Sequence, residues 1–205
     1  MAFGDFWRIT SIEVSKGSTS QARPGESLEV LLPEADIQAR VRALGEQISQ
    51  DYEGKPLLLV GILRGSFVFL GDLIRCVDGL MAVDFMAISS YGASTQSSGV
   101  VRILKDLDEE LQNRHVVVVE DIVDTGLTLN YIYSQLVARG AASVAICTLL
   151  DKPTRRRVDV HIDYLGFQIP DEFVVGYGLD FDEYYRNLPN VCRLKIHRPS
   201  KEANG

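Results

Sequence analysis

The segment from Val116 to Thr128, VVVVEDIVDTGLT, constrains the fold of this 205-residue chain more than any other part of it. Four consecutive valines predict a central β-strand that is covered on both faces of a sheet. Three carboxylates follow, and a short turn of small and hydroxyl-bearing residues then leads into a helical pattern. Open α/β sheets place their ligands at the carboxyl ends of their strands. The segment therefore predicts a ligand site just past a buried strand.

The side chains after the valines indicate what such a site would bind. Glu120, Asp121 and Asp124 are expected just past the strand end, where carboxylates can accept from hydroxyl groups or face a hard cation. The next residues, 125–128 (TGLT), offer backbone N–H groups and hydroxyls to a phosphate, which the helix dipole also favours. The combination indicates a ligand that is both anionic and hydroxylated, with Mg²⁺ between ligand and protein. A sugar phosphate has these properties.

Composition places the chain among ordinary globular proteins of one domain, with 46% hydrophobic and 24% charged residues. Its net charge of -7 argues against nonspecific binding of nucleic acid, which needs a basic surface. Cys76, Cys147 and Cys192 are far apart and odd in number, which predicts reduced thiols. The chain has neither a signal-peptide pattern nor an apolar run of the ~18 residues that span a membrane. We therefore expect a cytoplasmic protein without a membrane partner.

The pattern along the chain predicts an N-terminal extension over 1–33, partly flexible, a domain over 34–197 and a tail over 198–205. Ile37, Val41, Leu44 and Ile48 recur at helical spacing after Pro33. Further helices are expected after residue 66 and over 129–137, with Gly140 closing the second of them. Strands are expected over 57–62, 83–89, 100–104, 116–119 and 144–150. The unit 116–150 has the length of a βαβ crossover, which predicts an α/β fold with a parallel sheet flanked by helices.

The chain resembles the type I phosphoribosyltransferases, and among them those that act on hypoxanthine and guanine, from about Ile37 to Leu194. Residues 116–128 resemble the signature that binds phosphoribosyl pyrophosphate (PRPP), residues 63–66 the first loop, and residues 89–92 the catalytic flap. Lys152 with 173–180 and 184–186 resembles the purine and pyrophosphate sites. The resemblance implies a parallel sheet with a small hood subdomain. It also implies transfer of the phosphoribosyl group from PRPP to a 6-oxopurine, with Mg²⁺ and release of pyrophosphate.

The resemblance assigns roles around PRPP residue by residue. Thr125, Gly126, Leu127 and Thr128 would bind its 5′-phosphate, although many relatives carry a polar or basic residue where Leu127 stands. Glu120 and Asp121 would face the ribose hydroxyls, directly or through Mg²⁺. Asp124 would also contact PRPP and move the proton at purine N7 as a general base. Each group also has a structural alternative. Residues 125–128 could form a helix cap without a ligand, Glu120 and Asp121 a solvated acidic strand end, and Asp124 an Asx turn.

The remaining roles concern the base and the leaving group. Lys152 would donate to purine O6 and so reject adenine, which carries an amino donor at that position. Phe173 would stack on the ring, and Val174 would offer its backbone to the base edge. The last residues are expected around pyrophosphate: Arg186, the backbone of Arg64 and Gly65, Asp180 as a further Mg²⁺ ligand, and Ser90 and Tyr91 on the flap. Each of these residues also has an alternative that needs no ligand. Lys152 could be a surface lysine, Phe173 a core aromatic, Asp180 a turn acid, Arg186 an exposed arginine, and the flap a disordered loop.

Two rival functions stay open at this point. A regulator with the PRPP fold would bind RNA or DNA, and the run Arg155–Arg157 is the only feature that favours it. We expect this run to be a solvated or subunit-contact patch. A xanthine-preferring transferase would differ in how the pocket treats purine C2. The family usually assembles, so a homodimer or homotetramer is expected.

Overall fold

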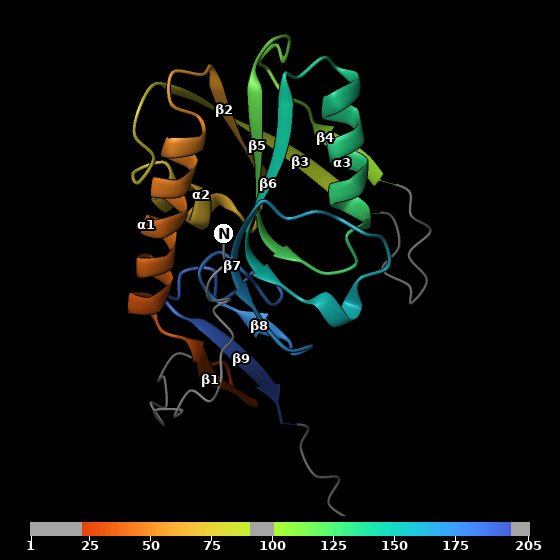
Figure 1. The fold of residues 1–205 in the computed structure, drawn as a ribbon. Helices are drawn as coiled ribbons and strands as arrows, with labels where there is room; N and C mark the ends of the chain where they lie inside the picture. The colour runs from red at the N-terminus through yellow and green to blue at the C-terminus, as the bar shows by residue number, and fades with distance from the viewer. Residues whose placement is uncertain (1–21, 91–100, 198–205) are drawn as a thin grey trace, which may run out of the picture.

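The computed structural model of the protein describes residues 22–90 and 101–197. Figure 1 shows a large sheet between helices, with a smaller sheet beyond its lower end. In chain order the elements are β1 (Glu26–Leu32), α1 (Glu34–Asp51), β2 (Leu57–Leu63), α2 (Phe67–Leu73), β3 (Met81–Ser90), β4 (Val101–Lys105), β5 (His115–Val123), α3 (Leu127–Ala138), β6 (Ser143–Asp151), the 3₁₀ turn η1 (Pro153–Arg155), β7 (Tyr164–Gln168), β8 (Val174–Val175) and β9 (Val191–Ile196).

The large sheet has six strands in the order β4-β3-β2-β5-β6-β7, and only β4 runs antiparallel to its neighbour. This confirms the predicted α/β fold with a mostly parallel sheet. The chain leaves β2 toward β3 on one side and leaves β5 toward β6 on the other. The carboxyl ends of β2 and β5 therefore flank the point where the strand order reverses, which is where such sheets bind ligands.

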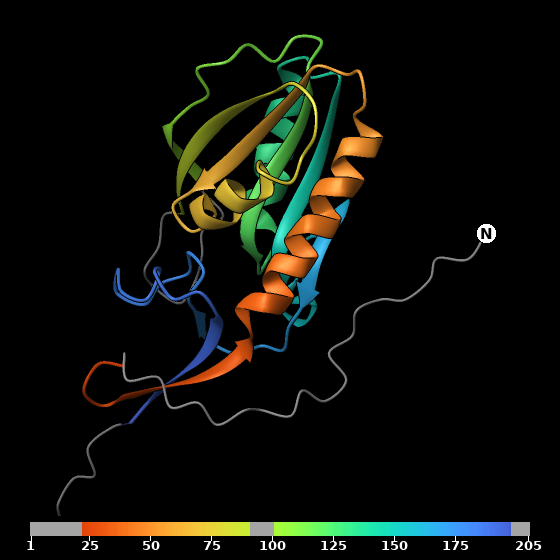
Figure 2. The same cartoon turned by 90° about the vertical axis from the view of Figure 1, so that its left-hand side faces the viewer.

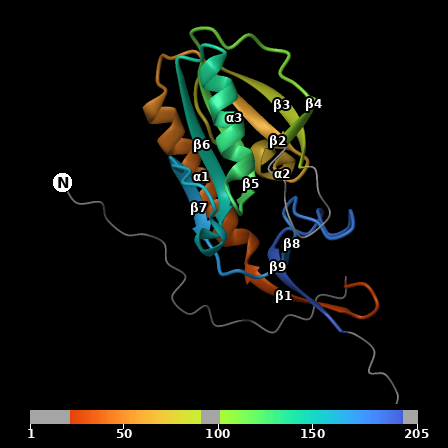
Figure 3. The same cartoon turned by 90° about the vertical axis from the view of Figure 1, so that its right-hand side faces the viewer.

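The valine strand β5 is buried on both faces, as predicted, because its alternate side chains serve two hydrophobic clusters. Val117 and Val119 pack with α1 and α2. Val116 and Val118 pack with Leu129, Ile132 and Leu136 of α3. Figure 3 shows α3 in front of the sheet and α1 behind it.

The two long helices form where the apolar spacing predicts them. The four apolar residues predicted to make one face of α1 are all fully buried. In α3 the predicted face is too wide, because Tyr133 and Val137 are 42% and 49% exposed. Gly140 follows the end of α3 with a φ of +82°, the left-handed conformation expected of a residue that closes a helix. Among the described helices, none is long and apolar enough to cross a membrane.

The smaller sheet, which we call the hood, has the order β1-β9-β8 and is antiparallel. Figure 2 shows it beyond the carboxyl ends of the main strands. β1 pairs with β9 from Glu26 to Leu32, so the hood includes chain that precedes residue 33. The segment 1–33, predicted as an N-terminal extension, therefore includes a strand of the hood, β1.

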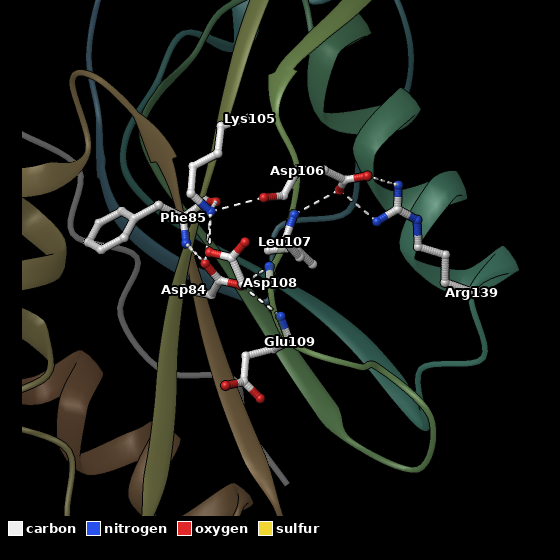
Figure 4. A network of polar contacts seen from close by, with 8 residues as sticks. All are labelled: Asp84, Phe85, Lys105, Asp106, Leu107, Asp108, Glu109 and Arg139. Carbon is white, nitrogen blue, oxygen red and sulfur yellow. Dashed lines mark hydrogen bonds and ion pairs between the residues drawn. The ribbon is translucent and has the colours of Figure 1, made fainter.

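A polar network fastens the antiparallel edge of the large sheet (Figure 4). Asp84 of β3, which is 6% exposed, accepts from the N–H groups of Asp108 and Glu109. The Lys105 ammonium contacts the Asp84 and Asp108 carboxylates at 3.2 and 3.0 Å. Burial opposes ionisation of Asp84, but the Phe85 N–H, which donates to it at 2.7 Å, together with these donors holds its pKa below the usual value. The network anchors the loop after β4 to the buried strand β3.

Candidate active site

Four segments meet at the carboxyl ends of the parallel strands: the loop after β2, the end of β5 with the turn into α3, the residues after β6, and the hood segment 173–186. All the described residues predicted for the site lie on these segments, apart from Ser90. Ser90 ends β3, and its side chain is not described. Tyr91 lies outside the described residues.

Glu120 and Asp121 lie within β5, whereas the sequence predicts them just past its end. The strand runs on to Val123 because its parallel pairing with β6 continues to Asp151. Burial, and then the Asp121 charge, raise the pKa of Glu120 well above its usual value. Burial also raises the pKa of Asp121 to about 6, against hydrogen bonds that lower it. The two carboxyl groups therefore form a buried acidic pair, and the charge of Arg186 in the hood is among the influences that lower the pKa of Asp121.

The loop after β2 fits closely against this acidic pair. A Cβ atom on Gly65 would lie 1.5 Å from Oδ2 of Asp121, so only glycine fits there. On its other side the Gly65 carbonyl faces Gly178 of the hood, whose own Cβ would lie 2.1 Å from that oxygen. The peptide bond between Leu63 and Arg64 is cis. Backbone of the first loop is thus enclosed between β5 and the hood.

The turn between β5 and α3 has the geometry of an anion site. Gly126 has a φ of +81° and precedes Leu127, the first residue of α3. The first N–H groups of a helix have no partner within it, and the helix dipole places positive charge there. Thr125 Oγ1 accepts from the Leu127 N–H at 3.4 Å, which keeps the turn tight. Leu127 contributes its backbone, so an apolar side chain is compatible with the cradle.

Asp124 is not free at the mouth of this turn. Nε of Arg155 contacts its Oδ1 at 2.6 Å, and Arg156 donates to its carbonyl oxygen at 2.9 Å. Arg156 also pairs with the buried Asp151. Arg155 and Arg157 are exposed, as predicted for a solvated run, whereas Arg156 is half-buried. Arg155 and Arg156 nevertheless both pair with acids at this edge of the sheet. The η1 turn after Lys152 brings them back over the end of β5, which spacing in the sequence does not reveal.

A pocket of about 440 Å³ opens beside Asp124 and has the size of a small-molecule site. Lys152, only 9% exposed, donates from Nζ to the Glu172 carbonyl oxygen at 2.6 Å. Phe173 is 53% exposed and meets the ring of Phe181 edge-on at 5.5 Å. The pocket is lined by Ile122, Asp124, Lys152, Arg155, Asp171, Glu172, Phe173, Val174, Leu179 and Asp180. A buried ammonium opposite an exposed aromatic face suits a planar ligand with an acceptor on its edge.

The hood supplies the charged rim. Asp180 Oδ1 contacts the guanidinium of Arg186 at 2.7 Å, and Arg186 also donates to the Gly178 carbonyl oxygen at 2.8 Å. Arg64, 68% exposed, contacts the Glu183 carboxylate at 2.5 Å. Cations from the first loop and from the hood therefore lie close together, since Arg186 also contacts the Glu183 carboxylate, at 3.3 Å.

Carboxylate oxygens are ligands that Mg²⁺ prefers. Oε2 of Glu120 is buried and has no hydrogen-bond partner, as expected for an oxygen that awaits a cation or a hydroxyl. Within residues 22–90 and 101–197, no group of three or more acidic, histidine or cysteine side chains is arranged to hold a metal ion. Mg²⁺ commonly keeps one or two carboxylates and takes its other ligands from substrate phosphates and water, so the acids present fit an ion that arrives with its substrate.

Sequence reasoning did not identify three contributors to the site. Gly178 contacts the first loop, Arg155 pairs with Asp124, and Asp171 lies 3.5 Å from the same Arg155 guanidinium. The two closely spaced glycines, Gly176 and Gly178, were a usable indication of a tight turn, because glycine adopts positive φ readily, and both have it here. No pattern marks the two ion pairs, which depend on how η1 packs.

Comparison with known proteins gives consistent matches. The phosphoribosyl transferase domain family matches residues 28–182. The hypoxanthine-guanine phosphoribosyltransferase of Staphylococcus aureus (strain Mu50 / ATCC 700699) is 52% identical over 167 residues, 82% of this chain and 93% of that protein. Its namesake from Mycobacterium tuberculosis (strain ATCC 25618 / H37Rv) is 49% identical over 191 residues, 90% and 95% of the two chains. A crystal structure of a hypoxanthine phosphoribosyltransferase from Staphylococcus aureus has a TM-score of 0.79 and 52% identity, covering 82% of this chain and 91% of the other.

Proposed function

The chain belongs to the phosphoribosyltransferase family, and we propose that it is a purine salvage enzyme. It would transfer the 5-phosphoribosyl group of PRPP to hypoxanthine, and to guanine, giving IMP or GMP and pyrophosphate. One observation carries the assignment to a 6-oxopurine. The buried Lys152 ammonium and the exposed Phe173 ring share one pocket with Asp124, directly beside the phosphate turn.

In this mechanism the turn 125–128 holds the 5′-phosphate through backbone N–H groups and threonine hydroxyls. Glu120 and Asp121 accept from the ribose hydroxyls, and their raised pKa values favour the hydroxyl-bound or cation-bound state over the empty one. Arg186 and the backbone of Arg64 and Gly65 receive the departing pyrophosphate. Mg²⁺, held by Glu120, Asp121 and Asp180, would neutralise the negative charge that gathers on the leaving group.

The base pocket supplies orientation and proton transfer. Phe173 stacks on the purine, and Lys152 donates to O6 while the Val174 backbone meets the base edge near N1 and C2. Asp124 takes the proton from N7 as the bond to C1 of the ribose forms; a positioned base of this kind contributes typically 10²–10⁴-fold in rate. Its ion pair with Arg155 orients the carboxylate at the pocket mouth. Ser90 and Tyr91 are proposed to belong to a flap that excludes water.

A base-panel assay tests this function. Wild-type protein is given PRPP, Mg²⁺ and, in parallel, hypoxanthine, guanine, xanthine or adenine, and nucleotide formation is followed by absorbance. Asp124→Asn should lower kcat by about 10²–10⁴-fold while PRPP affinity changes little. The exposed Asp159 provides the matched control, Asp159→Asn. Unchanged turnover in Asp124→Asn would remove its proton-transfer role.

The pocket lysine has its own test. Lys152→Ala should relax discrimination against adenine, because two facing donors no longer oppose each other. An unaltered preference would remove Lys152 from the base pocket. A preference of the wild-type protein for xanthine would favour the xanthine-preferring alternative.

The comparisons do not favour the rival regulator, which needs a nucleic-acid surface on a chain with a net charge of -7. Absence of turnover with every base, together with salt-sensitive RNA binding, would revive it. We also propose a cytoplasmic homodimer or homotetramer, which light scattering of the purified protein would detect. The divisions 1–33, 34–197 and 198–205 are kept as proposed segments, with β1 assigned to the hood.

A further inference from the structure

The hood loop between Asp180 and Arg186 has an unusual backbone. Phe181 and Tyr184 exchange two backbone hydrogen bonds of 3.1 Å each, so Asp182 and Glu183 form a two-residue turn. Both turn residues have positive φ, 55° and 65°, and Tyr185 follows at 77°. Such turns normally contain Asn-Gly or Asp-Gly, because side chains other than these disfavour the left-handed region. Three such residues within four positions persist only where surrounding contacts hold them.

One side chain from outside the loop contacts four of the five residues from Phe181 to Tyr185. The Arg23 guanidinium lies 5.1 Å from the ring centre of Phe181, 4.8 Å from that of Tyr184 and 5.8 Å from that of Tyr185. It also pairs with Asp182 of the turn at 3.1 Å. Cations over aromatic faces are attracted by the ring quadrupole. A single arginine therefore holds together every side chain from Phe181 to Tyr185 except that of Glu183.

Arg23 is itself held in place before β1. Its carbonyl oxygen accepts from the Glu26 N–H at 3.0 Å across Pro24 and Gly25, and Gly25 has a φ of +80°. Proline followed by a glycine with positive φ is the sequence of a type II turn. The Glu26 carboxylate, 9% exposed, contacts the guanidinium at 2.7 Å. The Tyr185 hydroxyl accepts from the Arg23 N–H at 2.9 Å and donates to Glu26. The arginine is therefore positioned by the turn that opens the hood.

The loop connects this arginine to the proposed site on two sides. Its ends carry Asp180 and Arg186, whose charged groups lie 2.7 Å apart. Its first ring, Phe181, packs edge-on against Phe173 in the purine pocket. Displacing the loop would therefore move both the pyrophosphate rim and the stacking face, although Arg23 lies in the chain before the first strand.

We propose that Arg23 is a positioning residue that fixes the loop 180–186 for binding of pyrophosphate and PRPP. The proposal rests on the proposed function, in which Asp180 and Arg186 serve the pyrophosphate end. It gives the chain before β1 a part in the active unit, which the sequence analysis leaves without a role.

Three variants of the full-length protein test the proposal. Arg23→Leu removes the cation, Arg23→Lys keeps a cation for the rings, and Arg42→Leu is the control on the exposed face of α1. The readouts are KM for PRPP, KM for pyrophosphate in the reverse reaction with IMP, KM for hypoxanthine, kcat and Tm. Arg23→Leu should raise the KM values for PRPP and pyrophosphate about 10-fold or more, since a displacement of about 1 Å at a binding group costs up to ~10²-fold. Arg23→Lys should recover most of that loss, and Arg42→Leu should match wild type.

Unchanged KM values for PRPP and pyrophosphate in Arg23→Leu would overturn the proposal. The proposal would also fail if Arg23→Leu impaired all three KM values and kcat to a similar degree, in step with a lower Tm, and Arg23→Lys recovered none of them. That result describes a purely structural residue. Should Arg23→Leu fail to fold, Arg23→Gln carries the same comparison. Arg186→Leu separates this inference from the site assignment. If Arg186→Leu leaves the pyrophosphate KM unchanged, the assignment itself fails; if it raises that KM while Arg23→Leu does not, only the inference fails.

Discussion

Replacing Gly65 with alanine should disable the site while leaving the fold in place. The added Cβ would lie 1.5 Å from Oδ2 and 2.5 Å from Cγ of Asp121. An ordinary contact needs about 3.5 Å, so the carboxylate or the loop must shift by about 2 Å. Either movement separates the acidic pair from the backbone N–H groups that are proposed to receive pyrophosphate.

The size of the effect follows from that displacement. Misplacing a catalytic or binding group by about 1 Å can cost ~10²-fold in rate. We therefore expect kcat/KM of Gly65→Ala to fall by at least ~10²-fold, which corresponds to about 2.7 kcal/mol of transition-state stabilisation. The assay is the absorbance assay with PRPP and hypoxanthine, accompanied by circular dichroism and thermal unfolding. Gly71→Ala in α2 is the matched control, since its Cβ would have no neighbour within 4 Å.

A double-mutant cycle identifies the clash as the cause. The clash with Asp121 should also lower Tm of Gly65→Ala without unfolding the protein. In an Asp121→Ala background the alanine at residue 65 has space, so this loss of stability should largely disappear. Wild-type kcat/KM in Gly65→Ala would refute the reasoning. An identical loss of stability with and without the Asp121 side chain would show that the close approach to β5 is not what demands glycine.

The remaining predictions concern charge, the edge network and the hood. Glu120→Gln should raise Tm of the unliganded protein at pH 8, with a difference that shrinks toward pH 4. Because Asp121 has a folded pKa of about 6 and that of Glu120 is also raised, the folded state holds extra protons, and wild-type stability is lost as pH rises through that range. Asp84→Ala should lower the free energy of unfolding in urea by about 2–4 kcal/mol, because buried donors lose their acceptor, with kcat little changed. A chain that begins at Pro33 lacks β1, exposes the edge of β9 and should lose activity and aggregate in light scattering, whereas a chain that begins at Ala22 keeps both β1 and Arg23.

Much of the fold follows from local pattern. Helical spacing located α1, and the valine run located β5 as a strand covered on both faces, because burial of apolar side chains imposes these periods. In α3 the same spacing predicts a buried face that includes Tyr133 and Val137, but both side chains are exposed. The sequence of a helix gives its apolar positions, but how many of them are buried depends on the sheet that the helix covers.

The end of β5, within the site, is a second place where the local pattern does not predict burial. Glu120 and Asp121 are expected after the strand, since charge ordinarily marks the end of a buried run. They remain in β5 because β6 continues to pair with it as far as Asp151. Their burial, and hence their raised pKa values, depend on that pairing partner and on Gly65.

Residue order alone indicated the chemistry of this protein: carboxylates that follow a run of valines, a glycine-threonine turn before a helix, and a lysine and an aromatic residue in the order of the family. These features are local, and each is specified by a few adjacent residues. Tertiary structure alone decided that Gly65 fits between Asp121 and Gly178, that Arg155 holds Asp124, and that Arg23 lies over the hood rings. Arg23 and Phe181 are far apart in the chain, and such contacts depend on how separately formed elements pack, which no local pattern encodes.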